Sequence, residues 1–362
     1  MSSHVLSSSV LPSTVLAHPL LRIAGDLSAI AWRQMEEWGQ SLGARFDAGV
    51  VDTKTSANDL VTQADAQIES LVRGFLDQVR PDDLMVGEEG AAALDPVAFF
   101  DEEFLRTLDC YDASTGSLVP VPVEDRVPEV GLEWHVDPID GTVNYVRGIE
   151  HFAFSVGVCR SNLAEGVTDI AVDGSGGGST GRDEAPVTDL DAVSRPGAGS
   201  VRNVGAGQWL FGLVASPGLD STWLAIAGAG AFKVDGRLGA QRSTEAVAAR
   251  RLHGTPEGLS GRILATGFAY KGDTRAPQLA KLFDLMSDYD DIRRCGSAAI
   301  DLCMVAEGKI NCYAERGLGI YDYAAGALIA EESGAYVRRG GTGGATAAAD
   351  SAEELERLIA TI

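Results

Sequence analysis

Residues 134–145 read WHVDPIDGTVNY and place two aspartates, Asp137 and Asp140, three positions apart and just before a glycine. The residues before Asp137 are typical of a strand, which would carry this carboxylate to the end of a sheet. Pro138 fixes one backbone torsion angle and removes a hydrogen-bond donor. Gly141 permits a tight turn and the close approach of other groups. Two carboxylates held this close repel each other, and a hard divalent cation is the simplest partner that removes the repulsion.

The backbone after Gly141 adds an anion-binding element to the two carboxylates. Thr142 stands where its own N–H group and the next ones can face an anion at a helix start. A phosphate could therefore bridge a bound cation and these amides. Taken alone, Asp-x-x-Asp-Gly is also an ordinary polar turn. It is not an EF-hand, whose loop needs alternating carboxylates and a final glutamate.

The composition limits the size of the fold and the class of partner. The 362 residues suffice for one large domain or two closely packed ones, and a hydrophobic content of 45% permits a substantial core. A formal net charge of −23 argues against a nucleic acid or an anionic membrane as partner. An anionic substrate stays open, because bound cations reverse the local field. No stretch approaches the roughly 18 uninterrupted apolar residues of a membrane span.

The cysteines and the first residues bear on localisation. The five cysteines form no CxxC pair and suit reduced thiols in a cytoplasmic protein better than a disulfide framework. The first 19 residues lack the basic segment and the compact apolar run of a signal peptide. We therefore expect a cytoplasmic protein in which residues 1–18 form a mobile tail.

Periodicity predicts helices and strands mixed along the whole chain, and hence layered α/β or α+β packing. Helices are expected from about residue 19 and over 64–79, 275–288, 297–307, 321–334 and 351–362. Strands are expected within 83–90 and over 133–137, 151–160, 209–215, 223–227, 231–234, 262–268, 309–315 and 335–339. Residues 91–131, which contain a possible helix at 96–108, and residues 161–204 are interpreted as insertions. Residues 19–245, which include both insertions, are expected to form an N-terminal half with the acidic motifs, and residues 246–362 a C-terminal half.

Further acidic motifs accompany the opening stretch in one order along the chain. They are KTSANDLVTQAD at 54–65, GEE at 87–89, GSAAIDLC at 296–303 and YDYAAG at 321–326. Taken singly, these motifs also have ordinary structural explanations. Glutamates after a strand are usually solvated, and Asp322 could simply cap a helix. Together with DPIDGTVN, they resemble the inositol monophosphatase family of magnesium-dependent, lithium-sensitive phosphatases. The resemblance runs from about residue 20 to 340, apart from the two insertions.

The resemblance implies a layered αβαβα sandwich, as in inositol monophosphatase and fructose-1,6-bisphosphatase, with the site where the two halves meet. It also implies a homodimer, two to three Mg²⁺ ions, and in-line attack of a metal-activated water without a phosphoenzyme. The small residues after Asp322 should let their helix pack tightly. Tyr321 stands where the family usually has tryptophan, so that one side of the site still carries an aromatic ring. The five histidines are not required.

The resemblance also assigns roles to individual residues. The implied metal ligands are Glu88, Asp137, the carbonyl of Ile139, Asp140 and Asp322. Glu88 and Thr142 should orient or deprotonate the attacking water. Asp65 should support a third, weaker metal ion through water. Glu89 should contact the metal ligands rather than an ion. The implied substrate contacts are Asp140, Gly141, Thr142, Ser297, Ala298 and Glu315. Lys54 matches a lysine near the entrance of the site and could equally be an exposed loop charge.

We expect a phosphoric monoester hydrolase that acts on inositol 1-phosphate or a similar polyol phosphate. Histidinol phosphate, fructose 1,6-bisphosphate and nucleotide phosphates remain alternatives, because related enzymes share the metal motif. A non-catalytic, metal-binding regulatory protein also remains open, because the chain carries two insertions and is strongly acidic. Either insertion could cap the pocket or alter the choice of substrate.

Overall fold

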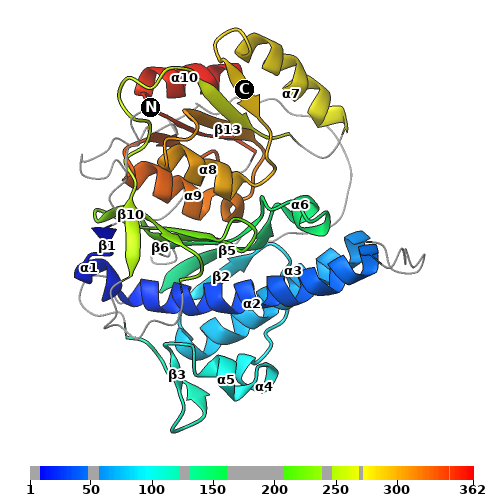
Figure 1. Ribbon diagram of the computed structural model, residues 1–362, viewed down its shortest axis with the longest axis vertical. Coiled ribbons are helices and arrows are strands. Elements are labelled where there is room, and N and C mark those ends of the chain that lie inside the picture. The colour runs from blue at the N-terminus through cyan, green and yellow to red at the C-terminus, as the bar shows by residue number, and fades with distance from the viewer. Residues whose placement is uncertain are drawn as a thin grey trace, which may run out of the picture.

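The computed structural model describes residues 9–47, 57–122, 131–160, 208–238, 247–268, 272–341 and 343–362. Its elements stack in five layers, helix–sheet–helix–sheet–helix (Figure 1). The first helical layer consists of α2 (Pro19–Asp47) and α3 (Ala57–Val79). The middle layer consists of α8 (Ala298–Ala306) and α9 (Ile320–Glu332). The last layer consists of α7 (Gly272–Leu285) and α10 (Ala352–Thr361). The predicted αβαβα sandwich is therefore confirmed.

The large sheet lies between the first and middle helical layers. Its strand order is β1-β10-β9-β8-β7-β6-β5-β2, and only the β2–β5 pair is parallel. Because helices cover both faces, strands such as β8 are buried at every position and do not alternate between apolar and polar residues. The strands are β1 (Ser9–Val10), β2 (Leu84–Gly87), β5 (Leu132–Asp140), β6 (Ala153–Arg160), β7 (Trp209–Ser216), β8 (Ser221–Ile226), β9 (Gly230–Asp235) and β10 (Ala248–Arg251).

The small sheet lies between the middle layer and α7 with α10, and its strand order is β12-β11-β13-β15-β14. Its strands are β11 (Ile263–Thr266), β12 (Asp291–Arg293), β13 (Cys312–Arg316), β14 (Tyr336–Arg338) and β15 (Ala345–Ala349). The sequence did not predict β15, whose residues ATAAA include four alanines, because alanine is depleted in strands. Pairing with β13 and β14 on its two sides overrides this weak local preference.

Small residues set the distance between α9 and the large sheet. A Cβ added to Gly157 of β6 would lie 2.5 Å from the Cβ of Ala324, and one added to Gly212 of β7 would lie 2.8 Å from the carbonyl oxygen of Ala325. On the other side of α9, a Cβ on Gly326 would lie 2.8 Å from the Cβ of Leu302 in α8. The helix is therefore packed as tightly as the run of small residues predicted.

The N-terminal residues differ from the expected mobile tail at residues 9–18. There β1 pairs with β10, and the short helix α1 (Ser13–Leu16) follows. Leu11 and Val15 lie in the main hydrophobic core, only 2% and 1% exposed. The tail prediction is wrong for these residues, because their few apolar side chains find a partner that lies far away in the sequence.

The described part of the predicted insertion at 91–131 forms short elements beyond the α2–α3 layer (Figure 1). The possible helix at 96–108 is two single turns, α4 (Pro96–Phe99) and α5 (Glu102–Leu105), and β3 (Tyr111–Asp112) pairs with β4 (Ser117–Leu118). Asp26 of α2 anchors the segment, because its carboxylate accepts the N–H groups of Asp109 and Cys110 at 2.8 Å each. Burial raises the pKa of Asp26 to about 7, against the opposing effect of these hydrogen bonds.

Two other expectations concern chain organisation. The expected division at residue 245 falls before β10, which still pairs with β9 of the large sheet. The second predicted insertion, 161–204, lies outside the described residues. Among the helices that are described, none combines the length and the apolar composition needed to cross a membrane.

The docking of α10 generates a prediction about acid stability. Burial alone would raise the pKa of Glu354, but hydrogen bonds from Arg357, Tyr289 and Arg262 outweigh it and lower that pKa to about 2. A depressed carboxyl pKa stabilises the fold above the unfolded-state value of 4.5 and loses that effect as the pH falls toward 2.

We therefore expect Glu354→Gln to lower the free energy of unfolding by roughly 1–3 kcal/mol at neutral pH. The difference from wild type should shrink as the pH falls below 4.5. Denaturant unfolding at a series of pH values measures it. Glu353→Gln, at an exposed position one residue away, is the matched control and should have little effect. A deficit of Glu354→Gln that does not change with pH would contradict this account.

Candidate active site

The two motif aspartates point to the same side because β5 is irregular between them. In a regular strand, residues three apart face opposite sides of the sheet. Here the register with β6 shifts between Asp137 and Asp140, as in a β-bulge. Gly141 follows with a φ of 90°, and a Cβ there would lie 2.8 Å from the carbonyl oxygen of His151. Only glycine fits that position before α6 (Thr142–Val146) begins.

Asp322 joins the pair from α9, in the middle helical layer. It is the third residue of that helix, and its Oδ2 accepts the N–H of Gly319 at 2.7 Å. One carboxylate oxygen from each of Asp137, Asp140 and Asp322 lies within 4.8 Å of the others. Asp322 therefore satisfies the backbone of the N-cap residue, Gly319, from inside the helix and is also a member of the acidic cluster.

Asp140 is oriented by the start of α8. Its Oδ2 accepts a hydrogen bond from the Ser297 hydroxyl at 2.6 Å and another from the Ala299 N–H at 2.7 Å. Ser297 in turn accepts the N–H of Ile300 as the N-cap of α8. With Oδ2 held by two donors, Oδ1 is the oxygen of Asp140 that is left for a cation.

The backbone next to the cluster is also bonded in place. The N–H of Ile139 donates to Asp137 Oδ1 at 3.1 Å, and the Thr142 hydroxyl donates to the Ile139 carbonyl at 3.0 Å. The Asn144 amide donates to the carbonyls of His151 and Cys295 at 2.7 and 2.8 Å, which ties α6 to the segment before α8. The sequence analysis did not identify Asn144, whose contact with Cys295 joins segments 151 positions apart.

Glu88 and Glu89, which follow β2, and Asp65 of α3 are further carboxylates near the cluster. Glu88 and Asp65 repel Asp137, although neither belongs to the group whose oxygens lie within 4.8 Å of one another. Burial, together with repulsion from Glu88, Glu89 and Glu69, raises the pKa of Asp65 to about 8. The Asp65 side chain is buried, and its Oδ1 has no hydrogen-bond partner among the described atoms. Glu88 is exposed to solvent, and partial burial together with repulsion from Glu89 and Asp140 raises its pKa.

Glu69 holds the turn that presents Glu88, and the sequence analysis missed it. This fully buried carboxylate accepts the N–H groups of Glu89 at 2.7 Å and Ala91 at 3.0 Å, and it pairs with Arg73 at 2.8 Å. A Cβ on Gly87 would lie 2.4 Å from its Cδ, so the turn sits directly on it. The available signal was its position on α3, one helical turn after Asp65.

The electrostatics of the cluster fit a cation. Burial and repulsion from Asp140 and Asp322 raise the pKa of Asp137 well above its usual range, and burial and repulsion from Asp140 also raise that of Asp322. Within the described part of the chain, no lysine or arginine forms an ion pair with Asp65, Asp137, Asp140 or Asp322. Buried carboxylates without such a partner are unstable as anions. An all-oxygen donor set suits a hard divalent cation such as Mg²⁺.

The other predicted substrate contacts lie on the C-terminal side of the cluster. Ser297 is 1% exposed, and Ala298 begins α8. Burial raises the pKa of Glu315 to about 7, against the hydrogen bond that Tyr313 donates to it at 2.8 Å. Asp140 is close enough to Glu315 to repel it. Lys54 lies outside the described residues.

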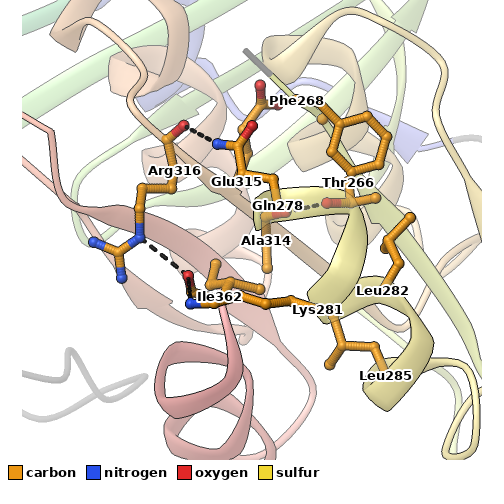
Figure 2. Close-up of a pocket in the computed structure, with 11 residues that line it drawn as sticks. Thr266, Phe268, Gln278, Lys281, Leu282, Leu285, Ala314, Glu315, Arg316 and Ile362 are labelled. Carbon is orange, nitrogen blue, oxygen red and sulfur yellow. Dashed lines mark hydrogen bonds between the residues drawn. The ribbon is translucent and has the colours of Figure 1, made fainter. Parts of the chain in front are cut away.

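Glu315 also lines a small cavity between α7 and the small sheet (Figure 2). The cavity offers about 20 Å³, which is room for little more than one water. Its polar groups are largely bonded to one another: Lys281 Nζ and Arg316 Nε both donate to the carbonyl oxygen of Ile362, at 2.6 and 3.1 Å. Because it contains none of the clustered aspartates, this cavity is not the candidate active site.

Comparisons with known proteins agree with this architecture. The sequence profile of the inositol monophosphatase family matches residues 25–168 and 203–360. These ranges cover most of the chain, which therefore belongs to the inositol monophosphatase family, as the motifs implied.

Three relatives illustrate the range of this family. An inositol-1-monophosphatase of Mycobacterium leprae is 34% identical over 318 residues, which are 86% of this chain and 80% of that protein. The solved structure of Mycobacterium tuberculosis SuhB is 28% identical, covers 95% of this chain and 97% of its own, and has a TM-score of 0.59. A protein of Pasteurella multocida called Nus factor SuhB is 27% identical over 286 residues, covering 79% of this chain and 73% of that protein.

The repulsion within the cluster predicts the effect of neutralising one carboxylate. In chelator-treated protein at neutral pH, we expect Asp137→Asn to raise the free energy of unfolding by roughly 1–2 kcal/mol. Burial and the neighbouring carboxylates force Asp137 either to keep an unfavourable charge or to take up a proton, and asparagine avoids both costs. Added Mg²⁺ should raise the thermal midpoint of wild type and have much less effect on the variant. Asp82→Asn, at an exposed position, should behave as wild type in both conditions. An Mg²⁺-induced shift of equal size in Asp137→Asn would contradict the assignment.

Proposed function

We propose that the chain is a cytoplasmic, Mg²⁺-dependent phosphomonoesterase that hydrolyses inositol 1-phosphate or a similar polyol phosphate and acts as a homodimer. The observation that carries this proposal is the convergence of Asp137, Asp140 and Asp322 to within 4.8 Å. Membership of the inositol monophosphatase family supports the reaction class. The printed name of the Mycobacterium leprae relative supports the substrate class.

The proposed ligands divide between two ion sites. Glu88, Asp137 and the Ile139 carbonyl would hold one Mg²⁺, and Asp137, Asp140 and Asp322 would hold another. Asp65 would support a third, weaker ion through water. Bound there, Mg²⁺ neutralises phosphate oxygens, lowers the pKa of water and stabilises the leaving alkoxide. Sensitivity to lithium is part of the same proposal, by resemblance to the family.

The side chains around the ligands would prepare the attack. Because the Thr142 hydroxyl donates its proton to the Ile139 carbonyl, its oxygen is left to accept a hydrogen bond from the attacking water. Glu88, which is exposed to solvent, would take the proton of that water. The backbone N–H groups of Gly141 and Thr142 would bind phosphate oxygens. The attack is then in line, without a covalent phosphoenzyme.

The residues on the C-terminal side would bind the alcohol portion of the ester. Glu315 and Asp140 would accept hydrogen bonds from polyol hydroxyls, and Ala298 would line the same pocket. Ser297 differs from the direct contact that we expected, because its buried hydroxyl already donates to Asp140 and accepts from Ile300. We therefore propose that Ser297 positions Asp140. The division into halves that meet at this site, 19–245 and 246–362, remains part of the proposal.

Two other functions are alternatives to the proposed one. The first is hydrolysis of histidinol phosphate or fructose 1,6-bisphosphate, which would use the same ion sites with a different pocket for the alcohol. A regulatory role without catalysis is the second, because some relatives carry the name Nus factor. The convergence of Asp137, Asp140 and Asp322 favours catalysis over that role.

A phosphate-release screen tests the proposed function. Polyol, sugar, amino-alcohol and nucleotide esters should be compared with Mg²⁺ and with chelator, and we expect the highest kcat/KM for a polyol monophosphate. Asp137→Asn should lower kcat/KM by more than about 100-fold, because Asp137 would be a ligand of both ions, while Asp82→Asn should match wild type. Failure of the wild-type protein to release phosphate from every ester in the presence of Mg²⁺ would overturn the proposal.

The positioning role of Ser297 has its own test. We expect Ser297→Ala to lower activity by about 10–100-fold and to raise the Mg²⁺ concentration needed for half-maximal activity, because Asp140 loses one of its two donors. Ser297→Thr keeps the hydroxyl and should restore most of the activity. A change in KM for the ester, with no change in the Mg²⁺ requirement, would instead indicate direct contact with substrate.

A further inference from the structure

A second group of metal-ligand side chains lies on the same strand as Asp137, nearer the start of β5. Glu133 of β5 is the direct register partner of Cys159 in β6. His135 is two residues beyond Glu133 and so lies on the same face of the sheet. The donor atoms of these three side chains all lie within 4.8 Å of one another.

Two of the three separations between these donor atoms match the geometry of one shared ion, and the third is close to it. His135 Nε2 lies 3.5 Å from Glu133 Oε2 and 3.6 Å from Cys159 Sγ, and that sulfur lies 4.0 Å from Glu133 Oε2. Bond lengths of about 2.3 Å to sulfur and about 2.0 Å to nitrogen and oxygen, at tetrahedral angles, require ligand separations of about 3.3–3.6 Å. Two of the three distances agree with this range, and the third exceeds it by a few tenths of an ångström.

The surroundings of the three side chains favour a bound ion over a simple hydrogen-bond chain. His135 and Cys159 are 4% and 1% exposed, and Nε2 is the ring nitrogen of His135 that faces the other two donors. The ring of His135 packs against Trp209, with centroids 5.3 Å apart, which limits its rotation. Glu133 is more accessible, with 21% of its side chain exposed, and gives an ion a path from solvent.

The chemistry of these donors separates this group from the acidic cluster. Asp137, Asp140 and Asp322 offer only oxygen, which suits Mg²⁺. A thiolate, an imidazole and a carboxylate together select zinc and similar borderline-soft transition metals. The two groups therefore suit different ions, although both take residues from β5.

We propose that Glu133, His135 and Cys159 bind one divalent transition-metal ion of the zinc class, with solvent at the fourth position. The Cys159 thiol releases its proton to solvent on binding, and His135 coordinates through Nε2. The ion joins β5 to β6 just before the irregularity that directs Asp137 and Asp140 to one side. Its binding therefore stabilises the register on which the acidic cluster depends.

Cobalt(II) tests the proposal, because coordination by a thiolate produces a charge-transfer absorption band in the near ultraviolet. The metal-free, reduced chain is saturated with Mg²⁺, and Co²⁺ is then added in steps. We expect a band that saturates at one Co²⁺ per chain and is removed by Zn²⁺. Cys159→Ser should abolish the band. Glu133→Gln, at the most accessible ligand, should keep the fold and weaken Co²⁺ binding by at least 10-fold.

Two matched controls locate the ion. Cys295→Ser changes a thiol that lies within 4.8 Å of His151 and Asp301, another group of potential ligands, and should keep the band. Asp137→Asn, in the acidic cluster, should also keep it. Absence of the band in wild type would overturn the proposal, as would its loss in Cys295→Ser or its persistence in Cys159→Ser. Phosphatase activity is not the readout, so failure of the proposed function leaves this result independent.

Discussion

Repulsion among the carboxylates of Asp137 and Asp140, which are buried, and Asp322, which is half-buried, is the constraint around which the centre of this molecule is arranged. Each would be more stable apart from the others or protonated, as the raised pKa values of Asp137 and Asp322 indicate. Donors from the protein hold every one in place: the Ile139 N–H, the Ser297 hydroxyl with the Ala299 N–H, and the Gly319 N–H. The fold therefore stabilises an arrangement whose remaining unfavourable charge a divalent cation can neutralise.

The tight packing of α9 determines whether the cluster can form. Asp322 reaches Asp137 only because α9 lies against β6 and β7 at positions where Gly157 and Gly212 have no side chain. A Cβ at either position would meet Ala324 or Ala325 at 2.8 Å or less, and the helix would have to move away. The packing between these two layers therefore fixes the geometry of the candidate active site, because a protein interior is too dense to absorb such a shift locally.

Strand β5 connects the acidic cluster to the proposed transition-metal site. Its residues 133 and 135 meet Cys159 through the regular register of an antiparallel pair, whereas residues 137 and 140 converge through a break in that register. The regular part brings together donors of mixed chemistry, and the irregular part brings together oxygen donors alone. Binding of an ion at the first part would resist slippage of the register, which would otherwise turn every side chain to the opposite face.

Local patterns in the amino-acid sequence were enough to predict layered packing of helices and strands, the order of most of these elements, and the acids of the motifs. These features depend on periodicity and on short spacings, which act between neighbours in the chain. Tertiary structure alone decided the burial of Leu11 and Val15, the alanine-rich strand β15, the support of the Glu88 turn by Glu69, and the use of Ser297 to orient Asp140. It also decided that Cys159 faces Glu133 and His135. Each of these depends on contacts between segments that are distant in the sequence, where packing and strand pairing override the weak local preferences of the residues.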